Sequence, residues 1–239
     1  MDYDEHVAAV ERESDALATA LGAGAADAAV PTCPDWTVDD LARHVGEFSG
    51  FWSHILCDGT GRPKTPFPDP PAEGLADWCR EALGHLATEL RATPADTEIW
   101  TWSDTDSSAR FAARRCAHEL AVHRVDAELA RGAHGPIDGA LAIDGIEEIF
   151  VMMGARERSG EAGGETLHLH GTDRDAEWLI TLDADGFDVR REHAKGDLAL
   201  RGAVSDLELT LYQRPPLGEL DRFGDESVLD AWYREFTFG

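Results

Sequence analysis

Glu119 and His123 are four residues apart in a segment, residues 114–126, whose composition favours a helix. At this spacing a carboxylate and an imidazole lie on one helical face, one turn apart, and can bind one divalent metal ion. The pair needs a third ligand from elsewhere, and we take His44 as the candidate. Other histidines remain available for this position: His54, His85 and His118. Two nitrogens and one carboxylate would leave coordination positions open, as in reactive metal sites.

Residues near these candidates suggest supporting roles. Asp126 follows His123 by three residues and could orient its imidazole through the second ring nitrogen, although an exposed aspartate would show the same spacing. Glu47, one turn from His44, is an alternative ligand. His118 lies about 100° from Glu119 around the helix, so we expect it outside the ligand set, either behind it or on the surface. Two arginines are candidate clamps for an anionic substrate, Arg43 and Arg115.

Four amphipathic helices must position these residues. The hydrophobic periodicity predicts them over residues 2–21, 38–57, 73–91 and 108–131. Thr37 and Asp40 resemble a capping box at the start of the second helix, with aspartate in place of glutamate. Four long helices favour a four-helix bundle, and such bundles build metal sites from facing helices. We therefore predict an N-terminal helical domain over residues 1–134.

The chain changes character after the glycine- and proline-containing segment 132–139. A helix is predicted over residues 140–155, followed by alternating, strand-like runs at 167–170, 178–182 and 187–190. Asp185 and Gly186 predict a hairpin turn between the last two runs. A further strand at 196–201 and helices at 205–212 and 225–236 complete the prediction. The overall fold class is thus α+β with two domains, the second, residues 140–239, carrying a mainly antiparallel sheet.

The composition limits the classes of partner. A formal net charge of −26 over 239 residues repels nucleic acids and anionic membrane surfaces. The four cysteines form no CxxC pair, which excludes a zinc ribbon and a thioredoxin motif. No signal peptide opens the sequence and no window is apolar for long enough to span a bilayer. We expect a cytoplasmic protein with reduced thiols, either a monomer or a weak homo-oligomer.

Two segments resemble a known family. Residues 34–45, Pro-Asp-Trp-Thr-Val-Asp-Asp-Leu-Ala-Arg-His-Val, together with residues 118–126, His-Glu-Leu-Ala-Val-His-Arg-Val-Asp, resemble the mycothiol-dependent maleylpyruvate isomerase family. The resemblance implies a DinB-like four-helix bundle that holds a divalent metal ion, usually zinc. Residues 196–207 resemble the sterol-carrier-like C-terminal domain of that family, with a less specific motif. Carried over residue by residue, the metal ligands fall on His44, Glu119 and His123.

The family's chemistry then gives the expected function. A low-molecular-weight thiol, mycothiol in that family, loses its proton at the metal and attacks a small electrophile such as maleylpyruvate. The outcome is isomerisation, or S-transfer if the adduct is released, and no protein nucleophile is needed. A non-catalytic protein that binds a metal or small ligand on the same scaffold is the alternative. A third reading is a hydrolase whose nucleophile is a metal-bound water, although no general base accompanies the ligands in the sequence.

Overall fold

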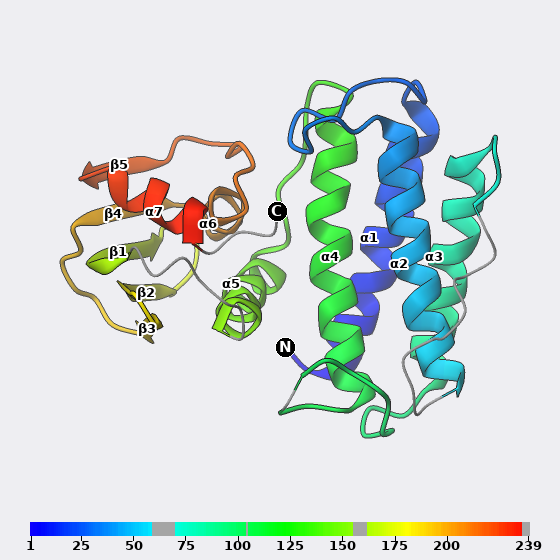
Figure 1. Cartoon of the computed structure of the whole chain (residues 1–239), viewed down its shortest axis with the longest axis horizontal. Helices are drawn as coiled ribbons and strands as arrows, with labels where there is room; N and C mark the ends of the chain where they lie inside the picture. Colours follow the sequence, from blue (N-terminus) through cyan, green and yellow to red (C-terminus); the bar gives the residue numbers. More distant parts are fainter. Residues whose placement is uncertain (59–69, 104, 155–161, 236–239) are drawn as a thin grey trace. The chain divides into compact units, whose positions relative to one another are not determined.

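The computed structural model describes residues 1–58, 70–103, 105–154 and 162–235 (Figure 1). The chain divides into two compact units, Met1–Gly135 and Pro136–Gly239. Together they form the two-domain α+β protein that the sequence predicts, with a helical first unit and a sheet in the second.

The described part of the first unit contains a bundle of long helices. They are α1 (Tyr3–Ala23), α2 (Val38–Asp58), α3 (Leu75–Ala92) and α4 (Ala109–Leu129). Each begins and ends within two residues of its predicted bounds. The main contacts of α1 are with α3 and α4, and those of α2 are with the same two helices. The helices α2 and α4, which carry the candidate ligands, are therefore neighbours.

Local hydrogen bonds set where α2 begins. The backbone N–H of Asp40 donates to the hydroxyl of Thr37 at 3.2 Å, and the backbone N–H of Thr37 donates to the Asp40 carboxylate at 2.9 Å. This is the reciprocal pattern of a capping box. It fixes the start of the helix less than two turns before His44, and thereby fixes the face on which His44 projects.

Small side chains bring the helices close together. Most residues of α4 are buried, and many of the buried ones are alanines. The helices α2 and α3 also approach closely, since a Cβ atom added to Gly46 would lie only 2.1 Å from a ring carbon of Trp78. Gly46 is therefore required by the packing of α2 two residues after His44.

The second unit begins with α5 (Gly139–Gly154), and its described residues include a mixed sheet. The strands are β1 (Gly163–Gly171), β2 (Glu177–Asp183), β3 (Gly186–Arg190), β4 (Leu198–Gly202) and β5 (Asp221–Gly224), and the later helices are α6 (Val204–Leu211) and α7 (Ser227–Glu235). The strand order is β3-β2-β1-β4-β5. Only the β1–β4 pair among these neighbours is parallel, so the prediction of a mainly antiparallel sheet is confirmed.

The two faces of this sheet differ. Leu167 and Leu169 of β1 are fully buried, and the helices α6 and α7 contact this strand. Trp178, opposite Leu169 in the register, donates its indole N–H to Glu147 of α5 at 2.6 Å. The alternate residues of β1, His168 and His170, project from the other face.

The edge strand β5 was missed by the sequence analysis. Its four residues are all exposed, so they show no alternation between buried and exposed positions that would indicate a strand. The predicted helix at 225–236 is observed as α7, and its last predicted residue lies outside the described residues.

Candidate metal centre

The packing of α2 against α4 brings three predicted residues together. His44 Nε2 lies 3.2 Å from Glu119 Oε1, and His123 Nε2 lies 3.3 Å from the same oxygen. The imidazole rings of the two histidines are 4.8 Å apart between centroids. One candidate donor atom from each of the three residues lies within 4.8 Å of the others. His44 and Glu119, which are 75 positions apart in the chain, thus present their donor atoms to one point together with His123.

These separations match those of ligands around one small ion. Zinc binds nitrogen and oxygen at about 2.0–2.1 Å, so two ligands at tetrahedral corners are about 3.3 Å apart. The separations from the Glu119 oxygen to the two histidine nitrogens, 3.2 and 3.3 Å, agree with this value. The chemistry also fits, because two imidazoles and one carboxylate suit zinc and other divalent transition metals.

The orientation of His123 is controlled from its far side. Its Nδ1 is 2.9 Å from Oδ2 of Asp126, which is fully buried. Because a carboxylate accepts, Nδ1 donates its proton to Asp126, and Nε2, the nitrogen that faces Glu119, is the one that can bind a metal ion. Asp126 is held in turn by the hydroxyl of Thr32, which donates to Oδ1 at 2.5 Å, and by the thiol of Cys33 at 3.6 Å. Such outer contacts orient metal-binding histidines in many proteins.

Arg115 contacts the other oxygen of Glu119. Its Nη2 donates to Oε2 at 2.7 Å, and the guanidinium is almost completely buried. This contact holds the carboxylate so that Oε1 faces both histidines. Arg115 therefore acts on Glu119 in this structure, whereas the sequence analysis also considered it as a clamp for substrate.

The charges of the cluster reinforce one another. Burial would raise the pKa of Glu119, but hydrogen bonds with His123 and His44 and the charge of Arg115 hold that pKa well below its usual range. Burial likewise opposes protonation of His123, yet Asp126 and Glu119 raise its pKa to about 9. In the absence of metal, a proton on His123 takes the place of a cation between two carboxylates.

An aromatic residue covers the two histidines. The Trp36 ring lies 5.0 Å from that of His44 and is stacked, 6.4 Å away, along that of His123. Trp36 belongs to the connection between α1 and α2, whose end is tied by hydrogen bonds from Val30 N–H to the Trp36 carbonyl and from Val38 N–H to the Ala28 carbonyl. The connection thus places an apolar surface beside the donor atoms.

Sequence reasoning did not assign Thr32, Cys33 and Trp36 to the site. The resemblance motif begins at Pro34, so it includes Trp36 but neither Thr32 nor Cys33. The contacts made by Thr32 and Cys33 span more than 90 residues of chain, and no local pattern reports them.

The remaining candidates lie elsewhere. His118 is fully buried, with its ring 6.0 Å from that of His6 on α1, so it is not a surface residue. Glu47 is exposed. The other histidines pair with neighbours on their own helices, His54 with Asp58 and His85 with Glu89.

Arg43 lies at the start of α2, near the cap. Hydrogen bonds from Thr37 lower the pKa of Asp40, and the charge of Arg43 adds to this effect. This interaction places Arg43 in the electrostatics of the helix start, and no described contact links it to Glu119.

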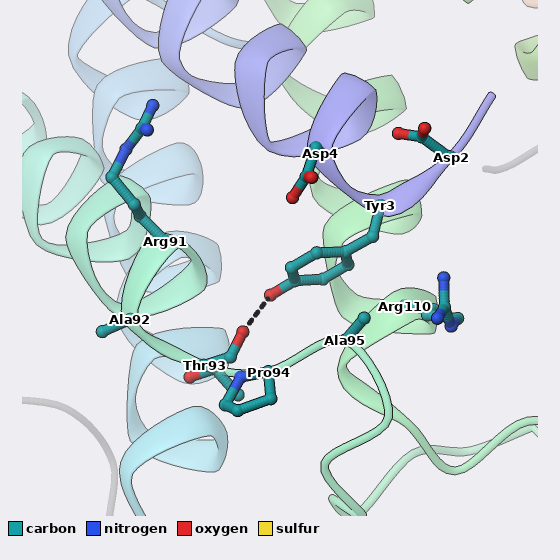
Figure 2. A pocket seen from close by; sticks show the side chains of 9 residues that line it. All are labelled: Asp2, Tyr3, Asp4, Arg91, Ala92, Thr93, Pro94, Ala95 and Arg110. Carbon is teal, nitrogen blue, oxygen red and sulfur yellow. Dashed lines mark hydrogen bonds between the residues drawn. The ribbon is translucent and has the colours of Figure 1, made fainter.

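A surface pocket of about 450 Å³ lies where α1 and α4 begin and α3 ends (Figure 2). It is lined by Asp2, Tyr3, Asp4, Arg91, Ala92, Thr93, Pro94, Ala95 and Arg110. The Tyr3 hydroxyl lies 2.7 Å from the carbonyl oxygen of Leu90 and 3.0 Å from that of Thr93, and it ties α1 to the end of α3. Burial, aided by the charge of Asp4, raises the pKa of Tyr3 to about 12, so this hydroxyl remains a hydrogen-bond donor. The pocket contains none of the candidate metal ligands.

Fold and site together define an α+β protein whose helical bundle carries a candidate metal centre. Residues 7–128, more than half of the chain, match the sequence family described as the mycothiol maleylpyruvate isomerase N-terminal domain. The chain belongs to this family. The comparison with curated proteins found no match. Within the described residues, no helix is long and apolar enough to span a membrane.

Two solved structures are similar to this chain in fold. The crystal structure of the mycothiol-dependent maleylpyruvate isomerase is similar with a TM-score of 0.66 and 14% identity, covering 93% of each chain. A histidine-to-alanine mutant of that enzyme gives a TM-score of 0.62 and 13% identity, covering 88% of each chain. At this identity, the similarity establishes a shared fold across both units.

Proposed function

We propose that this chain is a metal-dependent enzyme that uses a low-molecular-weight thiol, mycothiol or a close equivalent, to isomerise or conjugate a small electrophile such as maleylpyruvate. The observation that carries the proposal is the convergence of His44 and His123 on one oxygen of Glu119, at 3.2 and 3.3 Å. Membership of the family and the fold shared with a mycothiol-dependent isomerase support the choice of thiol and substrate class.

The residues of the chain would hold the metal ion, most simply zinc, and keep its surroundings fixed. When bound, such an ion favours the ionised form of a coordinated thiol. Asp126 keeps the Nε2 lone pair of His123 directed at the site. Arg115 keeps Oε1 of Glu119 turned toward the histidines. Trp36 provides an apolar wall, which limits access of water on that side.

The reaction follows from the chemistry of the thiolate. In an isomerisation, its sulfur forms a bond to one carbon of a cis double bond, and the former double bond can rotate as a single bond. Loss of the same thiolate then restores the double bond in the trans form. In a conjugation, the adduct takes up a proton and is released. We place this chemistry in the cytoplasm, where small thiols are kept reduced.

The test combines metal analysis with turnover of a thiol and maleylpyruvate. We expect His123→Ala to contain one metal ion fewer per chain than the wild type and to lose thiol-dependent turnover. His85→Ala is the matched control, because His85 pairs with Glu89 on the surface of α3, and it should retain both. Unchanged metal content in His123→Ala would refute the ligand assignment. Saturable thiol binding without turnover would instead support a non-catalytic binding protein.

A further inference from the structure

A second group of histidines lies in the sheet of the second unit, and the proposed function does not use it. His168 and His170 are two residues apart on β1, so they project from the same face, opposite the buried leucines. The antiparallel register places Glu177 of β2 directly across from His170. Cross-strand partners lie on one face, so Glu177 joins the two histidines there.

The connection from β3 to β4 adds a third histidine. Because the strand order is β3-β2-β1-β4, this connection, residues 191–197, must pass across β2 and β1. It does so on the histidine face, since His193 Nδ1 lies 2.9 Å from Glu177 Oε2. Gly196 lies against the backbone of β1, where an added Cβ would be 3.0 Å from the amide nitrogen of His168.

The four side chains surround one point. The three imidazole centroids form a nearly equilateral triangle with sides of 5.5, 6.0 and 6.2 Å, and the rings are steeply inclined to one another. Each residue contributes a donor atom that lies within 4.8 Å of the other three. Glu177 presents Oε1 to His170 Nδ1 at 2.5 Å and Oε2 to His168 Nε2 at 3.5 Å. These separations bracket the value of about 3.3 Å for neighbouring ligands of a tetrahedral zinc ion.

One donor atom has no hydrogen bond among the described residues. His168 is 5% exposed, and its Nε2 is buried without a hydrogen-bond partner, because the approach to Glu177 at 3.5 Å does not satisfy the geometry of a hydrogen bond. Leaving a buried polar atom unsatisfied is costly. A cation at the centre of the cluster would satisfy this nitrogen.

We propose that His168, His170, Glu177 and His193 form a second metal site, specific for a divalent transition-metal ion of the zinc type. Three nitrogens and a carboxylate oxygen supply four protein ligands, the number found in closed, structural zinc sites. The ion would tie the β3–β4 connection to β1 and β2. Without the metal, His170 and His193 form only a hydrogen-bonded cluster around Glu177.

The first test measures Zn²⁺ binding to the full chain by competition with a chromogenic chelator. The His123→Ala background removes the candidate site in the first unit and should retain one Zn²⁺ per chain. Adding His193→Ala should weaken this binding by about a hundredfold or more, since loss of an outer partner of a ligand already costs about 10- to 100-fold and here one of four ligands is lost. His193 is largely exposed, so the substitution leaves the fold intact. His85→Ala should have no effect.

The outcomes separate the two sites. Retention of one zinc ion that His193→Ala removes supports the second site, whatever happens to the first. A His123→Ala protein that binds no zinc, or that binds it equally well with and without His193, refutes the second site and shows a metal-free hydrogen-bonded cluster.

A proteolysis experiment gives an independent readout. The chain contains two lysines, Lys64 and Lys195, and Lys195 is two residues from His193. In the His123→Ala background, Zn²⁺ should slow cleavage after Lys195 by a lysine-specific protease about tenfold or more, because the metal-bound connection opens less often. Cleavage after Lys64 in the same sample is the internal reference. Equal protection in the variant lacking His193, or no protection at all, would overturn the proposal.

Discussion

The substitution Asp126→Asn tests how the candidate metal centre is built. It preserves the size of a fully buried side chain and removes the charge that faces His123 Nδ1 at 2.9 Å. An asparagine can also donate its amide N–H₂ to that nitrogen, and the ring proton would then be on Nε2, facing Glu119. The lone pair of Nε2 would no longer be available to bind the metal ion. The variant therefore changes the tautomer of His123 and leaves all three ligands in place.

The expected losses of metal affinity and of folding stability follow from the contacts of Asp126. Loss of an outer hydrogen bond to a metal-binding histidine weakens metal binding by about 10- to 100-fold, which corresponds to about 1.4–2.7 kcal/mol. Hydrogen bonds to a charged group contribute about 1.5–3 kcal/mol to folding. Thr32 and Cys33 also donate to Asp126. We therefore expect the metal-free variant to lose an amount of stability in this range.

The assay is Zn²⁺ affinity by chelator competition, with urea unfolding of the metal-free protein in parallel. Asp58→Asn is the matched control, because Asp58 pairs with His54 at 3.1 Å on the exposed end of α2. This control should change metal affinity by less than about twofold. If Asp126→Asn lowers stability but leaves the affinity of the first-unit site unchanged, Asp126 does not orient His123 and the reasoning fails.

Two further predictions concern packing and buried thiols. Gly46→Ala should destabilise the first unit by about 1–3 kcal/mol through the clash with Trp78. Gly84→Ala on α3, where an added Cβ meets nothing within 4 Å, should instead stabilise it by up to about 1 kcal/mol. Urea unfolding of both variants measures the difference, and equal effects on the free energy of unfolding would contradict the packing of Gly46 against Trp78. Burial raises the pKa of Cys79 to about 12 from an ordinary value of 9.0. The unfolded chain therefore loses this proton first, and stability should fall as pH rises from about 9 to 12. Cys79→Ala should flatten that slope in alkaline unfolding curves, and an unchanged slope would exclude Cys79 as its source.

The agreement between sequence and structure is best where the signals are local. Thr37 and Asp40 are three residues apart, and the capping box that they predict is present. Glu119 and His123 are one helical turn apart, so the period of the helix alone places them on one face. The edge strand β5 carried no such signal and was missed.

Contacts between distant residues lay beyond these patterns. Several histidines could have partnered Glu119, and the family resemblance pointed to His44; the packing of α2 on α4 brings it within 3.2 Å. The contact between Thr32 and Asp126 depends on the path of the connection between α1 and α2. A side chain's long-range partner is set by how whole helices pack, and no short window of sequence contains that information.

In the sheet, too, local sequence signals place some residues and long-range packing places the others. Alternation along β1 places His168 and His170 on one face, because side chains in a strand have a period of two residues. Nothing local indicates that Glu177 stands opposite His170 or that His193 crosses above them. Those neighbours follow from the strand order and the register, which pair residues by the hydrogen bonds of the complete sheet. The residue types and their local spacing thus lie in the sequence, whereas the donor sets around a common point exist only once distant segments have packed together.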